Sequence, residues 1–279
     1  MDGMGLGDRD LIKAACPLAG GGVNQGSTCG VVTGACLGLV LAASGDAGPE
    51  DPGRTAALYE RLRDFTAWFR GGFGSTLCRE RIGVDLANPR LVDNLLMGRM
   101  LTRCMSHIGP AAEYLATHAA APLTARETAG ARAGYCAEPV LEAIRERTGH
   151  ADEGLERVSM ALDGGIGLSG GLCGALAGAI LALGSSMGYD PREIGLLSTL
   201  SATAASQSKR KIRAREDVWG IGITMARAFR REFGSLECRD ISGRAFAGVD
   251  DLADCVGTSE VCARAIRWCS ENAPRSDVL

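Results

Sequence analysis

The chain has 279 residues, of which 46% are hydrophobic and 23% charged, so it can bury a core in each of two domains and is not disordered. Its net charge of −3 and its pI near 5.7 argue against non-specific nucleic-acid binding as the main activity. Aromatic residues make up only 5%, whereas glycine accounts for 39 residues. This composition favours helices packed through small side chains over β-sheets, which prefer β-branched and aromatic residues.

The N-terminal sequence MDGMGLGDRDLIK lacks the basic and apolar regions of a secretory signal, so we expect a cytoplasmic protein. Eleven cysteines are many for that compartment, because reducing conditions disfavour structural disulfides there. Such cysteines are more often metal ligands, cluster ligands or redox-active thiols. The alternative role for each of them is that of a small buried hydrophobic residue.

Two long stretches carry no charge except at their borders, residues 14–44 and residues 164–189. Each is long enough to cross a bilayer, but glycine, serine, threonine and asparagine interrupt its apolar residues. We therefore expect buried helices in both stretches and no membrane span.

The same sequence pattern occurs twice. GGVNQGSTCGVVTGACLGL at 21–39 resembles GGIGLSGGLCGALAGAILAL at 164–183, and FGSTLCRE at 73–80 matches FGSLECRD at 233–240. The cysteines paired in this way are Cys29 with Cys173 and Cys78 with Cys238. Repetition of both segments in the same order indicates a tandem duplication.

The residues between the matched cysteines predict one long helix in each copy. Apolar residues recur there at spacings of seven, four and four, and the first three of each set share one helical face. The two aligned sets are Leu58, Phe65, Phe69 and Phe73, and Val218, Met225, Phe229 and Phe233. The shared face supports the duplication independently of the cysteines.

A third, weaker match begins at Cys104, which starts a helix-like run in the first copy. The run from Cys255 or the run from Cys262 could be its counterpart, and we prefer Cys255 because two apolar residues then coincide. His107 and Cys104 would form a possible ligand pair on one helix. A solvated or hydrogen-bonded surface histidine is the commoner role, and we expect it here.

The second copy begins with an element that the first lacks, GYCAEPVLEAIRERTG at 134–149, which predicts an amphipathic helix bearing Cys136. The Ala-, Thr- and Arg-rich stretch 116–133 before it predicts a linker. We therefore expect two all-α domains over residues 1–122 and 123–279. Each is predicted to be a small helical bundle with a Gly-rich central helix.

Cys29 and Cys173 follow Gly-rich loops and stand where helices are predicted to start. Unpaired N–H groups and the helix dipole favour a thiolate at such a position, so we expect a lowered pKa for both thiols. Matched glycines recur four residues apart, and we expect Gly34 and Gly178 to lie at close helix crossings. A packing motif that happens to include a buried cysteine is the alternative.

The order of these cysteines resembles the C_GCAxxG_C_C family, a group named for four cysteines and inferred to be redox-active. YCAEPVL matches its first cysteine, CGALAG its second and FGSLEC its third, and a later cysteine in a helix completes the set. The resemblance covers most of residues 134–270, and the first copy repeats it over about 10–108 without the first cysteine. It implies these functional residues: Cys136, Cys173, Cys238 and Cys255 in the second copy, and Cys29, Cys78 and Cys104 in the first.

Four cysteines on separate helices could ligate an iron–sulfur cluster or another metal, or they could form reversible disulfides. We therefore expect a thiol-based redox or electron-transfer protein, with an iron–sulfur cluster or another thiolate-bound metal as the candidate cofactor. The sequence does not identify its redox partner or decide whether it forms a homo-oligomer. The alternatives are a metal-binding or sensing module without turnover and a structural helical-repeat protein. The basic run KRKIRAR at 209–215 fits a solvated loop better than a phosphate site.

Overall fold

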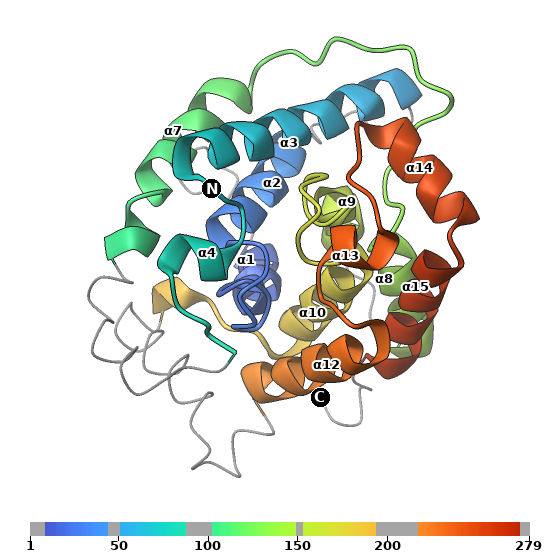
Figure 1. Ribbon diagram of the computed structural model, residues 1–279. Coiled ribbons are helices and arrows are strands. Elements are labelled where there is room, and N and C mark those ends of the chain that lie inside the picture. The colour runs from blue at the N-terminus through green and yellow to red at the C-terminus, as the bar shows by residue number, and fades with distance from the viewer. Residues whose placement is uncertain (1–8, 44–50, 88–101, 149–152, 194–216, 274–279) are drawn as a thin grey trace.

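The computed structural model of the chain describes residues 9–43, 51–87, 102–148, 153–193 and 217–273. Across these ranges the regular structure is helical, apart from the isolated β-bridges Thr28–Leu77 and Leu172–Glu237, which confirms the all-α prediction (Figure 1). The first copy contains α1 (Arg9–Ala15), the 3₁₀ helix η2 (Cys16–Leu18), α2 (Gly30–Ala43), α3 (Pro52–Phe73), α4 (Cys78–Ile82) and α7 (Ile108–His118). The second contains α8 (Glu138–Thr148), α9 (Glu153–Val158), the 3₁₀ helix η3 (Ser159–Leu162), α10 (Gly174–Met187), α12 (Val218–Phe233), α13 (Cys238–Ser242), α14 (Val249–Thr258) and α15 (Glu260–Asn272).

The long helices α3 and α12 each begin at an aspartate cap, although the two aspartates are not at aligned positions. The side chain of Asp51 accepts a hydrogen bond from the Gly53 N–H at 2.9 Å, and that of Asp217 accepts one from the Gly220 N–H at 2.6 Å. Each helix ends at a glycine with positive φ, the common way to close a helix C-terminus. A short turn then leads to the third matched cysteine of each copy.

The predicted shared face of α3 and α12 is buried in both copies. The residues that carry it are Leu58, Phe65 and Phe69 on α3, and Val218, Met225 and Phe229 on α12. The periodicity therefore identified both the helices and the faces that they turn toward the core.

The two copies exchange the helices that precede their Gly-rich loops. α1 and η2 of the first copy pack against α10, whereas α9 and η3 of the second copy pack against α2 (Figure 1). Each Gly-rich central helix is therefore covered partly by the other copy, and one hydrophobic core runs through both. The predicted domain boundary near residue 122 falls between α7 and α8 and stays a prediction.

The Gly-rich loops also cross between the copies. A Cβ atom at Gly222 on α12 would lie only 2.4 Å from Val23 in the first loop, so glycine is what allows this loop to approach. In return, a Cβ at Gly167 in the second loop would lie 2.8 Å from the sulfur of Cys36 on α2. The N–H of Leu172 donates a hydrogen bond to Thr28 Oγ1 at 2.8 Å and joins the two loops directly.

The prediction for the matched glycines is right for one copy and wrong for the other. A Cβ at Gly178 on α10 would lie 3.0 Å from the Cα of Ala137, so the chain before α8 crosses α10 closely there. At Gly34 on α2, a Cβ would meet nothing within 4 Å. The reason is that the segment around Ala137 has no counterpart among the described residues of the first copy.

Among the described residues, no helix is long and apolar enough to cross a membrane. The two uncharged stretches instead supply α2 and α10, which have 14 residues each. The basic run at 209–215 lies outside the residues that the structure describes.

Candidate functional site

In each copy, paired backbone hydrogen bonds hold two matched cysteines beside each other. The N–H of Cys173 donates to the Leu236 carbonyl at 2.8 Å, and the N–H of Cys238 donates to the Gly171 carbonyl at 2.6 Å. The same bonds, at the same distances, join Cys29 to Thr76 and Cys78 to Ser27 in the first copy. The matched loops are therefore a scaffold that brings the second and third cysteines of the motif together.

The loop before Cys173 has a backbone that few residues tolerate. Gly164 and Gly165 have φ of 59° and 80°, and Ile166 and Leu168 have φ of 66° and 57°. A β-branched residue at positive φ is strained and persists only where its surroundings hold it, and Ile166 is fully buried. A Cβ at Gly165 would also lie 2.8 Å from the Cβ of Cys238, so glycine lets the loop close over this cysteine.

Asp163 positions the first cysteine of the second copy. Its buried carboxylate accepts hydrogen bonds from the N–H groups of Tyr135 and Cys136, at 2.7 and 2.9 Å, and from the Tyr59 hydroxyl at 2.7 Å. The sequence analysis did not identify Asp163, although it is the one acidic residue in the stretch 158–189. An acidic residue directly before the Gly-rich loop, in an otherwise uncharged stretch, was the sequence feature that could have identified it.

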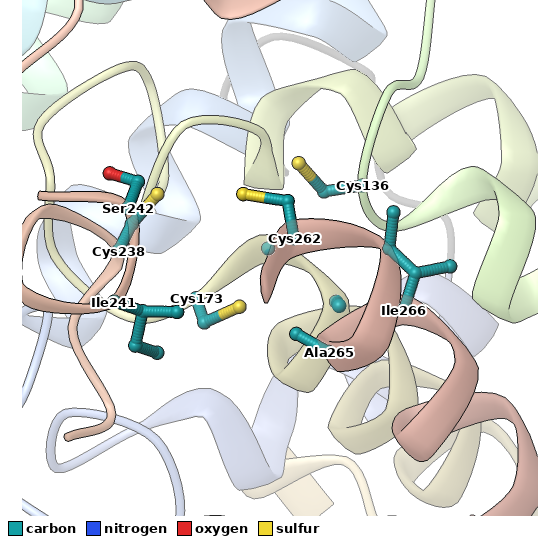
Figure 2. Close-up of a pocket in the computed structure, with 10 residues that line it drawn as sticks. Cys136, Cys173, Cys238, Ile241, Ser242, Cys262, Ala265 and Ile266 are labelled. Atoms are coloured by element: carbon teal, nitrogen blue, oxygen red, sulfur yellow. The ribbon is translucent and has the colours of Figure 1, made fainter. Parts of the chain in front are cut away.

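The structure corrects the prediction that Cys136 lies within a helix. α8 begins at Glu138, and Cys136 belongs to the turn before it. Asp163 accounts for this, because its carboxylate takes up the backbone N–H groups at the start of the segment. Cys136 consequently lies just before the N-terminus of α8, where it lines the same cavity as the other cysteines (Figure 2).

Four cysteines from four different elements line one small cavity in the second copy (Figure 2). They are Cys136, Cys173, Cys238 and Cys262, and we call them the second-copy site. The remaining lining residues are Gly174, Ala175, Ile241, Ser242, Ala265 and Ile266. The cavity measures about 20 Å³, which is room for roughly one water molecule. Three of the cysteines predicted for this copy thus come together, as the motif implied.

Cys262, and not Cys255, is the fourth cysteine at the cavity. Cys255 lies on α14, where it is buried and lies near enough to Cys262 and to Arg244 to raise the pKa of both groups. The preferred match of Cys104 with Cys255 is also wrong, because the burial patterns agree only if Cys104 corresponds to Cys262. The buried residues that then coincide are His107, Ala111 and Leu115 in the first copy with Ala265, Cys269 and Ala273 in the second.

Burial dominates the acidity of the thiols in the second-copy site. It raises the pKa of Cys136 and Cys238 well above the usual range and that of Cys262 to about 11. Cys173 stands at the start of α10, as predicted, without a side-chain cap hydrogen bond, and the nearby N–H groups of Leu176 and Ala175 act to lower its pKa. Its pKa is nevertheless raised, so the prediction of a lowered pKa is wrong, because loss of hydration outweighs the helix terminus.

The first copy holds a smaller set that we call the first-copy site: Cys29, Cys78 and Cys104. Cys78 packs against Cys104, and the charges of all three would interact. Cys29 and Cys78 are buried, whereas Cys104 is only half-buried. The pKa of Cys29 is raised because burial outweighs the opposing effect of two backbone N–H groups and the Arg81 guanidinium, so the lowered pKa predicted for this thiol is wrong as well.

His107 is buried and not a surface residue, which corrects the sequence interpretation. Its ring stacks on Phe69 and Phe73, with centroids 5.6 and 5.2 Å away, and its Nε2 accepts a hydrogen bond from Arg81 Nε at 3.1 Å. Burial, and the positive charge of Arg81, lower the pKa of His107 and keep it neutral. The histidine therefore holds Arg81 in place beside Cys29.

Neither site forms a ready metal centre. Within the described ranges, no three Cys, His, Asp or Glu side chains lie close enough together to hold a metal ion. All eleven cysteines are free thiols. Of those outside the two sites, Cys16, Cys36 and Cys269 are buried in the hydrophobic core, as the packing alternative expected. The thiols of the second-copy site thus have the donor chemistry of a metal or cluster site but not its geometry.

Comparison with known families gives one match. The model of the family described as "Putative redox-active protein (C_GCAxxG_C_C)" matches residues 1–118 and again residues 134–273. Neither the curated proteins nor the solved structures contain a significant match. The two matched ranges coincide with the two copies of the repeat.

Proposed function

The chain belongs to the C_GCAxxG_C_C family, and from this premise we propose that it is a thiol–disulfide redox protein. It stores an electron pair in the thiols of Cys262, at the second-copy site, and of Cys255 on the adjoining helix α14. The observation that carries the proposal is the meeting of Cys136, Cys173, Cys238 and Cys262 at one cavity, from four separate elements. Buried cysteines that served only packing would be expected to lie scattered through the core, as Cys16 and Cys36 do.

Cys262 and Cys255 are the pair best placed to form a disulfide, because they lie on the neighbouring helices α15 and α14 and Cys255 is the first of the thiols that raise the pKa of Cys262. Cys262 is half-buried and faces the cavity, so it is the sulfur that an external disulfide R–S–S–R can reach. The Cys262 thiolate attacks one sulfur of R–S–S–R and releases R–S⁻. The Cys255 thiolate then attacks the Cys262 sulfur, forms the Cys255–Cys262 disulfide and releases the second R–S⁻. Two protein thiols are oxidised and one external disulfide is reduced to two thiols, the protons of the protein thiols passing through solvent to the released R–S⁻ groups.

An iron–sulfur cluster or another thiolate-bound metal is the second candidate. Four cysteines around one cavity are the donor set that clusters and soft metals use, and this is the observation in its favour. In the observed geometry no three of these thiols could share a metal ion, so the side chains would have to move. The dithiol proposal needs no such movement.

One preparation separates the two candidates. The full chain is purified without oxygen, and its metal content and visible spectrum are measured. It is then oxidised with glutathione disulfide and mapped cysteine by cysteine through differential alkylation and mass spectrometry. We expect a colourless protein with a reversible Cys255–Cys262 disulfide. Stoichiometric iron with visible absorbance would overturn the dithiol proposal in favour of the cluster.

Two variants make the test specific. Cys255→Ser should stop oxidation at a mixed disulfide on Cys262, because the resolving thiol is gone. Cys16→Ser removes a comparably buried thiol far from the cavity and should keep the two-electron oxidation. If neither the parent nor the Cys16→Ser protein forms a reversible disulfide and neither holds metal, the cysteines are packing residues.

A further inference from the structure

Among the described residues, the first-copy site lacks the cover that Cys136 and Ala137 give the second-copy site. In the second copy, Cys136 and Ala137 cover the first turns of α10: Cβ atoms at Gly174 and Gly178 would lie 2.9 Å from the Cys136 Cβ and 3.0 Å from the Ala137 Cα. No described residue takes that place on α2, where Gly34 is half-buried and a Cβ would meet nothing within 4 Å.

The neighbouring side chains show the same opening. Ile266 on α15 is half-buried in the second copy, where α15 packs against α8. Its counterpart Ile108 on α7 is 43% exposed, and Met105 beside it is 45% exposed. Cys104, one residue before Met105, is the half-buried thiol of the first-copy site. The sulfur that solvent can reach therefore lies beside the uncovered face.

The walls of the two sites also differ in charge. Ile241 and Ala265 line the second-copy cavity, and their counterparts in the first copy are Arg81 and His107. Arg81 donates hydrogen bonds to His107 and to the Phe73 carbonyl, which fix its guanidinium near the thiols. This cation counteracts the burial that raises the pKa of Cys29 and so favours the Cys29 thiolate, the form that attacks a disulfide.

We propose that the first-copy site is a thiol–disulfide exchange site for a small-molecule disulfide, one sulfur of which occupies the place that Cys136 fills in the second copy. The Cys104 thiolate attacks that sulfur and releases one R–S⁻. The Cys29 thiolate then attacks Cys104, forms the Cys29–Cys104 disulfide and releases the second R–S⁻. Two thiols are oxidised and one external disulfide is reduced. The inference shares with the proposed function the premise that these cysteines do redox chemistry, but it concerns a different site.

The test uses the reduced full chain and 4,4′-dithiodipyridine, a neutral small disulfide whose released thiol is followed by stopped-flow absorbance. We expect a fast phase that Cys104→Ser abolishes and Cys36→Ala, which removes a buried thiol elsewhere on α2, leaves intact. Gly34→Leu fills the uncovered place and should slow the fast phase by about tenfold or more, since exchange depends on access to the sulfur.

The outcomes are separable from those for the proposed function. A folded Gly34→Leu protein that reacts at the parent rate would overturn the inference, as would a fast phase that survives Cys104→Ser. A parent protein without a fast phase would also overturn the inference, because the uncovered face would then not bind a small disulfide. The Cys255–Cys262 disulfide is measured at equilibrium in the second copy, so its failure would leave a Cys104-dependent fast phase detectable.

Discussion

The two copies share one scaffold but enclose their cysteines differently. In both, paired backbone hydrogen bonds of 2.8 and 2.6 Å fix the second and third cysteines of the motif. In the second copy a turn anchored on Asp163 adds Cys136 to an apolar cavity, which the half-buried Cys262 also lines. In the first copy that turn has no described counterpart, and Arg81 and His107 stand where the second copy has Ile241 and Ala265. Duplication has thus kept the framework, while the wall of the site has changed from closed and apolar to open and charged.

Asp163 is the residue on which the closed site depends most, so its loss should have the largest effect. Asp163→Ala leaves at least two buried N–H groups and the Tyr59 hydroxyl without their acceptor, at about 1–3 kcal/mol each. We expect a loss of about 3 kcal/mol or more in the free energy of unfolding, measured by urea denaturation. Ala19 occupies the matching place in the first copy and is exposed, so Ala19→Ser is the control and should change little. An Asp163→Ala protein as stable as the parent would show that this carboxylate does not anchor the turn.

Substitution of the matched glycines Gly178 and Gly34 should give the next largest difference in stability between the two copies. Gly178→Leu forces a side chain into the backbone of Ala137 and should destabilise the protein by about 1–3 kcal/mol. Gly34→Leu meets open space and replaces glycine in a helix, so it should be neutral or stabilising by up to about 1 kcal/mol. Thermal melts of both variants check this. Equal destabilisation by the two substitutions would mean that the face of α2 at Gly34 is covered after all.

Alkaline pH should weaken the reduced protein through the buried thiols of both copies, since burial also raises the pKa of Cys36 and Cys78 in the first copy. Burial raises the folded-state pKa of Cys136 and Cys238 well above that of an unfolded cysteine, and that of Cys262 to about 11. The unfolded chain therefore loses these protons first, so the free energy of unfolding should be constant below the ordinary cysteine pKa and fall as pH rises beyond it. Denaturation of the reduced protein from neutral to alkaline pH measures the slope, which Cys238→Ser should reduce. A stability that rises over this range would contradict the closed, apolar description.

The smallest expected effect concerns the charge at the open site. Arg81→Gln removes the cation that counteracts the raised pKa of Cys29, so this pKa should rise further. Thiolate absorbance titrated against pH, in a variant that keeps Cys29 as its observed thiol, reports the change. The control Arg70→Gln removes another cation of the first copy, one that donates a hydrogen bond to the Ser169 carbonyl. It should leave the pKa of Cys29 unchanged. Identical titrations for Arg81→Gln and the parent would show that Arg81 does not affect the pKa of Cys29.

Local sequence patterns predicted the parts of the fold that depend on local physics. The spacing of Leu58, Phe65 and Phe69 predicted α3 and its buried face, because a helix repeats every 3.6 residues. The Gly-rich loops predicted that Cys29 and Cys173 would precede helices, and both do. The repeated motif also indicated that Cys136, Cys173 and Cys238 belong together.

What the sequence could not predict depends on contacts between distant segments. The exchange of α1 and α9 between the copies is a matter of long-range packing, which no local period records. Gly34 and Gly178 look alike in sequence and differ only in what lies across from them. The pKa of Cys173 follows from its burial, which outweighs the helix terminus that the sequence did show. Cys262 took the place expected for Cys255 because the turn at Ser259 separates α14 from α15, and only α15 reaches the cavity.

The central claim is that the first copy exchanges disulfides rapidly, whereas the second copy reacts more slowly and stores the electron pair. The most direct test measures how fast each cysteine is modified. Reduced parent protein is mixed with 4,4′-dithiodipyridine and quenched at successive times, and the modified cysteines are identified by mass spectrometry. The account predicts that Cys104 is modified first, that Cys262 follows more slowly, and that Cys136 and Cys238 are protected in the folded protein. Modification of Cys136 or Cys238 before Cys104, or at equal rates throughout, would contradict it.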